Sequence, residues 1–332
     1  MTDEPASGED RLIARYFAPL AQHPGAFGLI DDAAAIAPPP DCDLVLKTDA
    51  IVGGVHFFEN DPADVVAQKA LRVNLSDLAA KGASPLGFLL SIALPKGISE
   101  DWLAAFASGL KHDIAQFNCP LFGGDTVKSP GAVMISVAMI GSVPQGTMVK
   151  RGGAQVGDHI FVTGTIGDAA LGLRLRQDES AASRWKLDAA MREHLLSRYL
   201  VPQPRNAIAE SLRINASGGM DVSDGLAGDL TKMCRAANVS AEIEVARVPL
   251  SAGAKAALAA DPTLIEPILT GGDDYEVLAA IPPARRDAFV AGAKSAGVPV
   301  ADIGVVTAGG DAPKFMWNGR PFNFARRSFS HF

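Results

Sequence analysis

The sequence has 332 residues, of which 48% are hydrophobic and 20% charged, and its formal net charge at pH 7 is -7. This length allows two domains with sizeable cores, and the apolar content excludes a disordered chain. The negative charge and the lack of any Lys/Arg run argue against nucleic acid as a partner, so we expect none.

The composition also predicts the cellular compartment. The three cysteines are far apart and form neither a CxxC pair nor a disulfide framework, which suits a reducing compartment: Cys42, Cys119 and Cys234. The stretch Met1–Asp10 is acidic and polar, so we expect no signal peptide. The longest apolar runs, near Pro85–Pro95 and Ala132–Val143, are too short and too polar to span a bilayer. We therefore expect a cytoplasmic protein with no membrane partner.

The first half of the chain alternates predicted helices and strands, assigned from the spacing of apolar residues. In order they are a helix at Arg11–Leu20, a strand at Asp43–Thr48 that ends at Asp49, a helix at Ala63–Lys81, a strand at Gly87–Leu94, a helix at Asp101–Gln116, a strand at Pro120–Thr126 that runs into a glycine turn, and a strand at Ala132–Ile140. The last strand has little polarity on either face, which predicts a central position in its sheet.

The second half repeats the α/β pattern after a stretch rich in Gly and turn residues, Gln145–Asp158. We place the domain boundary here, with one domain at 1–150 and a second at 151–332. The predicted elements are strands at Ile160–Thr163, Ala241–Val245, Val277–Ile281 and Ile303–Val306, helices at Ala169–Leu175, Ala189–Tyr199, Asn206–Leu212, Ala254–Ala260 and Ala284–Ala296, and a polar loop at Asp178–Ser183.

Asp221–Leu226, with the sequence DVSDGL, precedes a helical pattern. Ser223 or Asp224 could cap that helix, and a helix start favours anions. Acidic side chains at such a start can also recruit a cation and hold a phosphate through it. Similar acidic residues beside small residues recur at Asp31, Asp32, Asp49, Asp77, Asp125, Asp273 and Asp274.

These acids predict a particular chemistry. Oxygen-only ligands suit Mg²⁺ rather than zinc, and the six histidines show no zinc-type spacing. Phosphoryl transfer needs divalent ions and positioning more than a nucleophilic side chain. If the acceptor is a phosphate monoester, its second pKa of about 6 leaves it ionised without a general base. No GxxxxGK[ST] loop occurs, so metals and backbone would hold the nucleotide.

Eight motifs in order resemble the thiamine-monophosphate kinase family over nearly the whole chain, from about Leu12 to Phe332. They are GxxDDAA (Gly28–Ala34), TDxxVxGVHF (Thr48–Phe57), NLSDLAAKGA (Asn74–Ala83), FGGDT (Phe122–Thr126), VTGTIGDAALGL (Val162–Leu173), DVSDGL, GGDDYE (Gly271–Glu276) and a terminal HF. The resemblance implies an aminoimidazole ribonucleotide synthetase-like fold with two α/β domains, the first forming a homodimer and the second completing the active site.

The resemblance further implies ATP-dependent phosphorylation of thiamine monophosphate to thiamine diphosphate, by direct in-line transfer with several Mg²⁺ ions. Two alternatives remain open: another ATP-using enzyme of the same superfamily with a different acceptor, and a non-catalytic protein that binds nucleotide or thiamine phosphate. Aminoimidazole ribonucleotide synthetase fits the motifs less well. Selenophosphate synthetase is disfavoured because this chain has no reactive cysteine motif near its N-terminus.

The resemblance also assigns site residues by motif. The implied metal ligands are Asp32, Thr48, Asp49, Asp77, Asp125, Asp221 and Asp224. The implied nucleotide contacts are Gly124, Asp125, Arg151 and Ser223, and the implied contacts to the acceptor are His56 and Asp273. The implied catalytic residues are Asp77, Asp125, Arg151 and Asp224.

From the residues alone, simpler interpretations remain for three of them. Asp77 could pair with Lys81 at i, i+4 on its helix, Arg151 could be a solvated loop residue, and His56 could be structural.

The chain departs from the family pattern at a few positions. Lys47 stands where a small hydroxyl residue is usual, and Asp273 is one methylene shorter than the usual Glu. Near the tail, an aromatic residue that stacks on the acceptor is replaced at its aligned position by Arg326, with Phe324 and Phe329 nearby.

Overall fold

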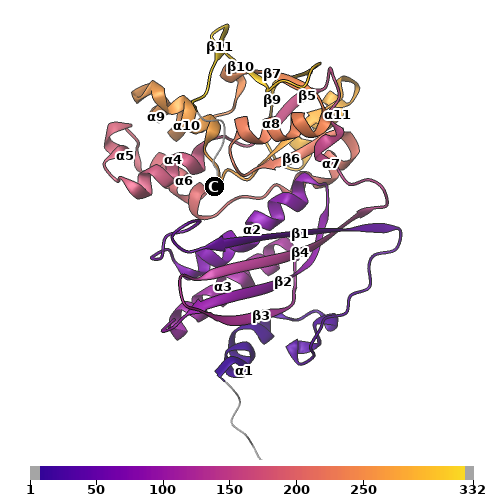
Figure 1. Cartoon of the computed structure of the whole chain (residues 1–332), viewed down its shortest axis with the longest axis vertical. Helices are drawn as coiled ribbons and strands as arrows, with labels where there is room; N and C mark the ends of the chain where they lie inside the picture. Colours follow the sequence, from indigo (N-terminus) through magenta and orange to yellow (C-terminus); the bar gives the residue numbers. More distant parts are fainter. Residues whose placement is uncertain (1–7, 326–332) are drawn as a thin grey trace, which may run out of the picture. The chain divides into compact units, whose positions relative to one another are not determined.

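The computed structural model describes residues 8–325. The chain divides into two compact units, one built from the residues up to Leu75 and from Ser84–Gly146, the other from Ser76–Ala83 and from Thr147 onward. Helices and strands are present in both units, which confirms the predicted α/β class (Figure 1). Arg326, Phe329 and the terminal HF lie outside the described residues. Within residues 8–325, no helix is both long and apolar enough to cross a membrane.

The first unit is a four-stranded sheet with two long helices on one of its faces (Figure 1). Its elements are α1 (Gly8–Leu12), short π and 3-10 turns at Ile13–Phe17, Ala18–Leu20 and Pro24–Leu29, β1 (Cys42–Val52), α2 (Ala63–Ala80), β2 (Ser84–Pro95), α3 (Glu100–Phe117), β3 (Leu121–Ser129) and β4 (Met134–Pro144). The strand order is β1-β4-β2-β3, so β4 is an inner strand, as predicted.

Two strands are longer than the sequence predicted. The prediction that a strand ends at Asp49 was wrong, because β1 pairs with β4 from Cys42 to Val52. A glycine turn after Phe122 was also wrong, because β3 continues in parallel pairing with β2 through Gly123 and Gly124. Turn residues in a sequence indicate local preference only, and the ladder hydrogen bonds to a neighbouring strand override it.

Helix α2 agrees with its predicted range, but its polar face is not solvated. Leu71, Leu75 and Leu78 are fully buried, and so is Asn74 from the polar face. The Asn74 side chain accepts a hydrogen bond from the backbone N–H of Asp49 at 2.9 Å and donates to Ala70 O at 3.0 Å. The helix therefore fixes the backbone of β1 beside a candidate metal ligand.

The second unit contains a seven-stranded sheet of order β11-β10-β7-β9-β5-β8-β6. Its strands are β5 (His159–Thr163), β6 (Gly218–Val222), β7 (Ser240–Glu244), β8 (Glu276–Ile281), β9 (Val300–Thr307), β10 (Lys314–Trp317) and β11 (Arg320–Phe322). Its helices are α4 (Asp168–Gln177), α5 (Ala181–Arg184), α6 (Ala189–Leu200), α7 (Ala209–Asn215), α8 (Leu226–Ala237), α9 (Ala252–Ala260), α10 (Ile265–Thr270) and α11 (Arg286–Ser295).

Short apolar strands and amphipathic helices explain this unit. β8 is buried along its whole length, as expected for a strand with neighbours on both sides and helices on its faces. Helix α8 buries Leu226, Leu230 and Met233 against the sheet. The predicted loop at Asp178–Ser183 was wrong in part, because Ala181–Arg184 forms the short helix α5 around the buried Ala181.

Candidate active site

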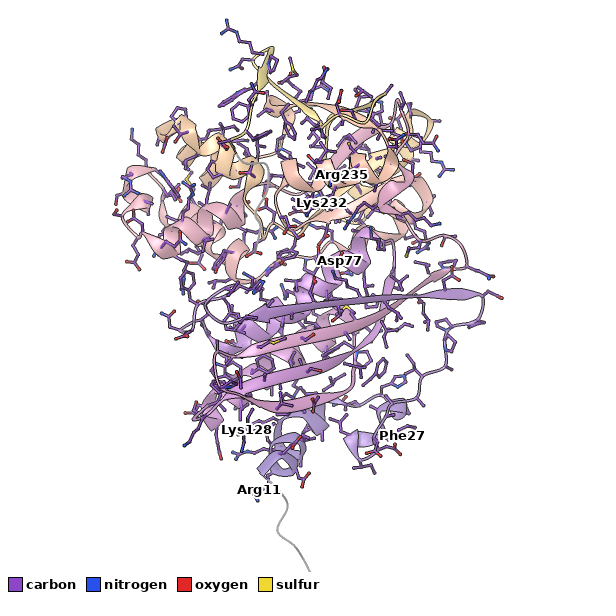
Figure 2. The ribbon with its side chains drawn as sticks, in the orientation of Figure 1. Arg11, Phe27, Asp77, Lys128, Lys232 and Arg235 are labelled. Carbon is purple, nitrogen blue, oxygen red and sulfur yellow. The ribbon has the colours of Figure 1, made fainter. Side chains whose placement is uncertain are left out.

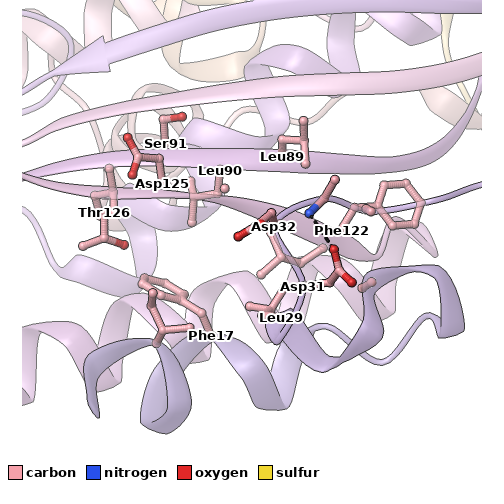
Figure 3. A pocket seen from close by; sticks show the side chains of 18 of the residues that line it. Phe17, Leu29, Asp31, Asp32, Leu89, Leu90, Ser91, Phe122, Asp125 and Thr126 are labelled. Carbon is pink, nitrogen blue, oxygen red and sulfur yellow. Dashed lines mark hydrogen bonds between the residues drawn. The ribbon is translucent and has the colours of Figure 1, made fainter. Parts of the chain in front are cut away.

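A cavity of about 700 Å³ in the first unit collects several of the candidate residues (Figure 3). Asp32, Gly124 and Asp125 line it, together with the polar residues Asp31 and Ser91. Apolar side chains from the N-terminal turns and from β2 and β3 form the rest of the wall, among them Ile13, Phe17, Leu29, Leu89 and Phe122. The cavity thus offers carboxylate and hydroxyl oxygens on one side and an apolar surface on the other.

The glycines of the FGGDT motif explain how Asp125 reaches this cavity. A Cβ atom at Gly124 would lie 1.8 Å from the carbonyl oxygen of Leu90, so only glycine allows β3 to approach β2 this closely. The parallel register then places Asp125 opposite Ser91, and both side chains are exposed on the same face of the sheet. The backbone at Gly124 is open to a ligand.

The candidate ligands on β1 lie beside a cation of the chain itself. Thr48 is exposed and Asp49 half-buried. The ammonium of Lys47 forms an ion pair with Asp49 Oδ1 at 3.1 Å, since residues at i and i+2 of a strand share a face. The Lys47 side chain therefore points toward the candidate metal ligand Asp49.

His56 has structural contacts in the turn after β1. The backbone N–H of Val52 donates to His56 Nδ1 at 3.0 Å, and Lys69 Nζ donates to the His56 carbonyl oxygen at 2.9 Å. Because Nδ1 accepts in this arrangement, the neutral ring carries its proton on Nε2. These contacts fix the orientation of the His56 ring. A fixed ring is compatible both with a structural histidine and with a histidine that contacts a ligand.

In the second unit, the DVSDGL motif forms a turn between β6 and α8. The prediction that Ser223 or Asp224 caps the helix was wrong, because the N-cap residue is Gly225 and it makes no side-chain cap. Instead the Asp229 carboxylate reaches back from the helix, and its Oδ2 accepts from the backbone N–H groups of Ser223 at 3.0 Å and Asp224 at 2.8 Å. Gly225 has φ +103°, and a Cβ there would lie 2.5 Å from Thr270.

A lysine that the sequence analysis missed completes this turn. Lys232 lies on α8, where Figure 2 labels it. Its Nζ donates to Asp224 Oδ2 and, at 2.8 Å, to Asp229 Oδ1. Burial raises the pKa of Asp229, and the Lys232 ammonium only partly offsets this effect. Burial lowers the pKa of Lys232, but the hydrogen bonds to Asp224 and Asp229 outweigh it and raise that pKa overall. The i, i+3 spacing of Asp229 and Lys232 is a signal that the sequence does contain.

The GGDDYE motif lies directly beside this turn. The N–H of Asp273 donates to Ser223 O and that of Tyr275 to Val222 O, both at 2.8 Å. Asp273 and Tyr275 have φ of +71° and +49°, a backbone conformation that non-glycine residues rarely adopt and that clusters at functional sites. The structure therefore brings together Asp221, Ser223, Asp224 and Asp273.

The residue after Asp273 explains how the loop keeps this conformation. The fully buried Asp274 carboxylate accepts from the N–H groups of Gly167 at 2.7 Å and Ala169 at 3.3 Å, at the start of α4. Burial raises the pKa of Asp274 well above its usual range, because these backbone contacts do not replace full solvation. Asp274 belongs by its motif to the candidate ligand-binding acids, whereas in the fold it anchors the loop to the helix.

Asp77 and Arg151 take different places in the second unit. Asp77 is half-buried on the last turns of α2, where its neighbour Ser76 approaches Tyr275 O at 3.5 Å. Arg151 is exposed in a short turn beside the end of α8, since a Cβ at Gly152 would lie 2.6 Å from Ala236 O. Asp224 precedes the start of α8, about 15 Å away along the helix axis, so Arg151 and Asp224 are not brought together within this unit.

A second polar cluster lies at the start of α4. The buried Asp168 carboxylate accepts from Thr165 Oγ1 at 2.5 Å and Ser251 Oγ at 2.6 Å, and lies 2.9 Å from His194 Nε2. Burial raises the pKa of Asp168, but the hydrogen bonds from His194, Ser251 and Thr165 outweigh it and lower that pKa. The hydrogen bond to Asp168 raises the pKa of His194 against the opposing effect of burial.

This cluster predicts a pH-dependent stability. A raised His194 pKa stabilises the fold below its unfolded value of about 6.5, and the contribution is lost as pH rises through the folded pKa. The lowered Asp168 pKa stabilises the fold above its unfolded value, and that contribution is lost as pH falls through the folded pKa. Between the folded pKa of Asp168 and that of His194, both charges of the pair are present. We therefore expect His194→Gln to lower the free energy of unfolding most near pH 5 to 6 and least above pH 8.

Urea unfolding of both proteins over that pH range measures this difference. His112→Gln is the control, because His112 is exposed and its ring only meets Gln116, at 3.1 Å. A His194→Gln penalty that stays constant with pH would contradict the assignment.

Two of the three cysteines are poor nucleophiles because they are buried. Burial raises the pKa of the Cys119 thiol to about 12 and that of Cys234 to about 11, so both stay protonated at neutral pH. Cys42 is half-buried, and no cysteine among the three is in a disulfide.

The chemistry of the candidate ligands fits Mg²⁺, because all of them offer oxygen atoms. The first unit holds Asp32, Thr48, Asp49 and Asp125, and the second holds Asp77, Asp221 and Asp224. Two of these carboxylates already contact a cation of the chain, Lys47 on Asp49 and Lys232 on Asp224. Within residues 8–325, no group of three or more His, Cys, Asp or Glu side chains is placed to hold a metal.

Comparison with known proteins identifies the family. Two family models match the chain, AIR synthase related protein, N-terminal domain, at residues 30–143 and AIR synthase related protein, C-terminal domain, at residues 155–313. A thiamine-monophosphate kinase of Caulobacter vibrioides is 40% identical over 323 residues, which are 96% of this chain and 89% of that protein. This chain belongs to the thiamine-monophosphate kinase family.

Solved structures of the family agree. Thiamine-monophosphate kinase from Stenotrophomonas maltophilia K279a superposes with a TM-score of 0.81 at 36% identity, covering 93% of this chain and 95% of that chain. AaThiL complexed with AMPPCP and TMP superposes with a TM-score of 0.77 at 30% identity, covering 93% of this chain and 97% of that chain. The resemblance and the aminoimidazole ribonucleotide synthetase-like fold expected from the motifs are thereby confirmed.

Proposed function

We propose that this protein transfers the γ-phosphoryl group of ATP to the phosphate of thiamine monophosphate, giving thiamine diphosphate and ADP. The observation that carries the proposal is the full-length similarity to AaThiL, which is complexed with AMPPCP and TMP. The cavity lined by Asp32, Gly124 and Asp125 supports it, because it combines oxygen ligands with an apolar wall and an open backbone.

In the proposed reaction, an oxygen of the acceptor phosphate forms a bond to the γ-phosphorus while the bond to the oxygen of ADP breaks. The acceptor is largely ionised at neutral pH, so no side chain has to remove a proton. This agrees with the protonated state of Cys119 and Cys234. The catalytic work of the chain is then positioning and charge balance.

We propose roles for the candidate residues on this basis. Asp77, Asp125 and Asp224, with Asp32, Thr48, Asp49 and Asp221, would hold Mg²⁺. Bound Mg²⁺ supplies neutralisation of phosphate charge. The Gly124 backbone, Ser223 and Arg151 would bind the nucleotide. His56 and Asp273 would orient the acceptor.

The decisive assay mixes purified protein with ATP and Mg²⁺, with and without thiamine monophosphate, and separates the products by chromatography. Thiamine diphosphate formed in equal amount to ADP is the expected result. ATP consumption that another phosphorylated acceptor stimulates, and thiamine monophosphate does not, would point to a different superfamily activity. Binding of thiamine monophosphate without turnover would make the protein a binder, the alternative that the Lys47–Asp49 ion pair favours.

The free cysteines suit an enzyme of the reducing cytoplasm.

We further propose that the protein is a homodimer through the sheet of the first unit. Helices α2 and α3 cover one face of this sheet, and its other face exposes apolar side chains: Leu44, Leu46, Leu89, Val127 and Met134. Several large apolar side chains exposed on one face of a sheet are typical of a protein interface. Leu46, at 73% exposure, lies in β1 on that face.

Light scattering at micromolar concentration tests the dimer. The wild type is expected at twice the 34.5 kDa chain mass, and Leu46→Glu is expected to shift it toward the monomer. Val156→Glu, at an exposed apolar position of the second unit, is the control and should stay dimeric. A monomeric wild type would overturn the proposal.

A further inference from the structure

Lys232 is a cation of the chain that lies between two carboxylates. Its ammonium donates to two carboxylates at once, Asp224 and Asp229, from the second turn of α8. No motif of the sequence assigns it a role, and it lies eight residues after Asp224. The side chain is 37% exposed, so it can move without disrupting the core.

The two carboxylates differ in their freedom. Asp229 is fully buried and anchored, since its Oδ2 also accepts from the backbone N–H groups of Ser223 and Asp224. Asp224 is 37% exposed, and Lys232 contacts its Oδ2. The ammonium therefore has one fixed partner and one partner that faces solvent.

We propose that Lys232 neutralises Asp224 in the metal-free protein and that a divalent cation displaces its ammonium from Asp224 onto Asp229. The inference rests on the proposed role of Asp224 as a metal ligand. A divalent ion and an ammonium repel each other when they share one carboxylate, and Asp229 retains the displaced charge at 2.8 Å. Lys232 thus lowers the affinity of the site for metal and keeps the turn ordered until metal arrives.

Thermal unfolding of the full chain in a Mn²⁺ series tests this competition. Without metal, Lys232→Met is expected to melt below the wild type, because Asp224 and Asp229 lose their shared counter-ion. With Mn²⁺, its melting temperature is expected to rise more steeply, corresponding to about tenfold tighter binding. Lys232→Gln should behave in the same way, and Lys232→Arg, which keeps the charge, should resemble the wild type. Lys255→Met is the control, because Lys255 is an exposed residue of α9.

The two outcomes separate cleanly. A lower melting temperature without metal, together with tighter Mn²⁺ binding, supports the displacement. Loss of a merely structural lysine would instead lower the melting temperature by the same amount with and without Mn²⁺. Unchanged or weaker Mn²⁺ binding in Lys232→Met and Lys232→Gln, or no Mn²⁺ effect in any protein, overturns it. The assay for thiamine diphosphate on the wild type is scored independently, so failure of the proposed activity is distinguishable from failure of the metal exchange.

Discussion

Replacing Asp77 by Asn is expected to lower kcat by about 10²- to 10³-fold, the size of losing one preorganised charge in a transition-state site. Asparagine keeps the shape of the side chain but removes the negative charge that the proposed metal ligand must supply. Asp77 is half-buried on α2, and its buried neighbours in the chain, Ser76 and Leu78, are unchanged. We therefore expect the free energy of unfolding to stay within about 1 kcal/mol.

Steady-state kinetics with varied ATP and varied thiamine monophosphate measure this loss, and urea unfolding measures the stability. Asp64→Asn is the matched control, an exposed aspartate in the first turn of the same helix. Full activity of Asp77→Asn would show instead that Asp77 only pairs with Lys81 along the helix surface.

Replacing Glu276 by Ala is expected to destabilise the protein by about 3–5 kcal/mol, because the buried Arg198 and the half-buried Arg205 would lose their shared carboxylate. Glu276 is fully buried at the start of β8. Its Oε1 accepts from Arg198 at 2.8 Å, and Arg205 donates to both of its oxygens, at 2.6 and 2.5 Å. Thr163 Oγ1 donates to it as well, at 2.6 Å.

The activity of this variant is expected to fall too, even where the protein remains folded. Arg198 also donates to the backbone oxygen of Asp274 at 2.9 Å, so the ion-pair cluster supports the loop that presents Asp273. Denaturant unfolding measures the stability, and Asp287→Ala is the control. Asp287 is 97% exposed and pairs with Arg286 at 3.4 Å, so its loss should cost less than about 1 kcal/mol. An equally small effect at Glu276 would contradict the argument.

Periodicity alone located most of the secondary structure. Apolar residues recur at helical spacing or in short runs in six elements, and their observed bounds lie within a few residues of the predicted ones: α2, α3, α6, β2, β4 and β5. The errors at Asp49 and Gly123–Gly124 have one cause. Local preference predicts a turn at such residues, but β1 and β3 extend because β4 and β2 supply hydrogen-bond partners from distant parts of the chain.

For the site, the ordered motifs identified the family and named most of the acids. They did not distinguish ligand candidates from structural acids, because the sequence motif DVSDGL or GGDDYE is compatible with both. Asp274 anchors a loop to α4, and Asp229, which no motif singled out, anchors the turn before α8. The aromatic residue Phe324 packs edge to face on Phe315 and Phe322, at 4.9 and 5.0 Å, so the hydrophobic core of the second unit uses it.

The sequence by itself determined the α/β class, the family and the oxygen-rich chemistry, since these depend on composition, periodicity and ordered motifs that are local in the chain. Only the tertiary structure decided which charges meet. Lys47 contacts Asp49 and Lys232 contacts Asp224 because a strand face and a helix turn bring these side chains together, and burial then sets whether each carboxylate anchors the backbone or stays open to a ligand. Spacing suggests such pairs, but burial and hydrogen bonding depend on the whole fold.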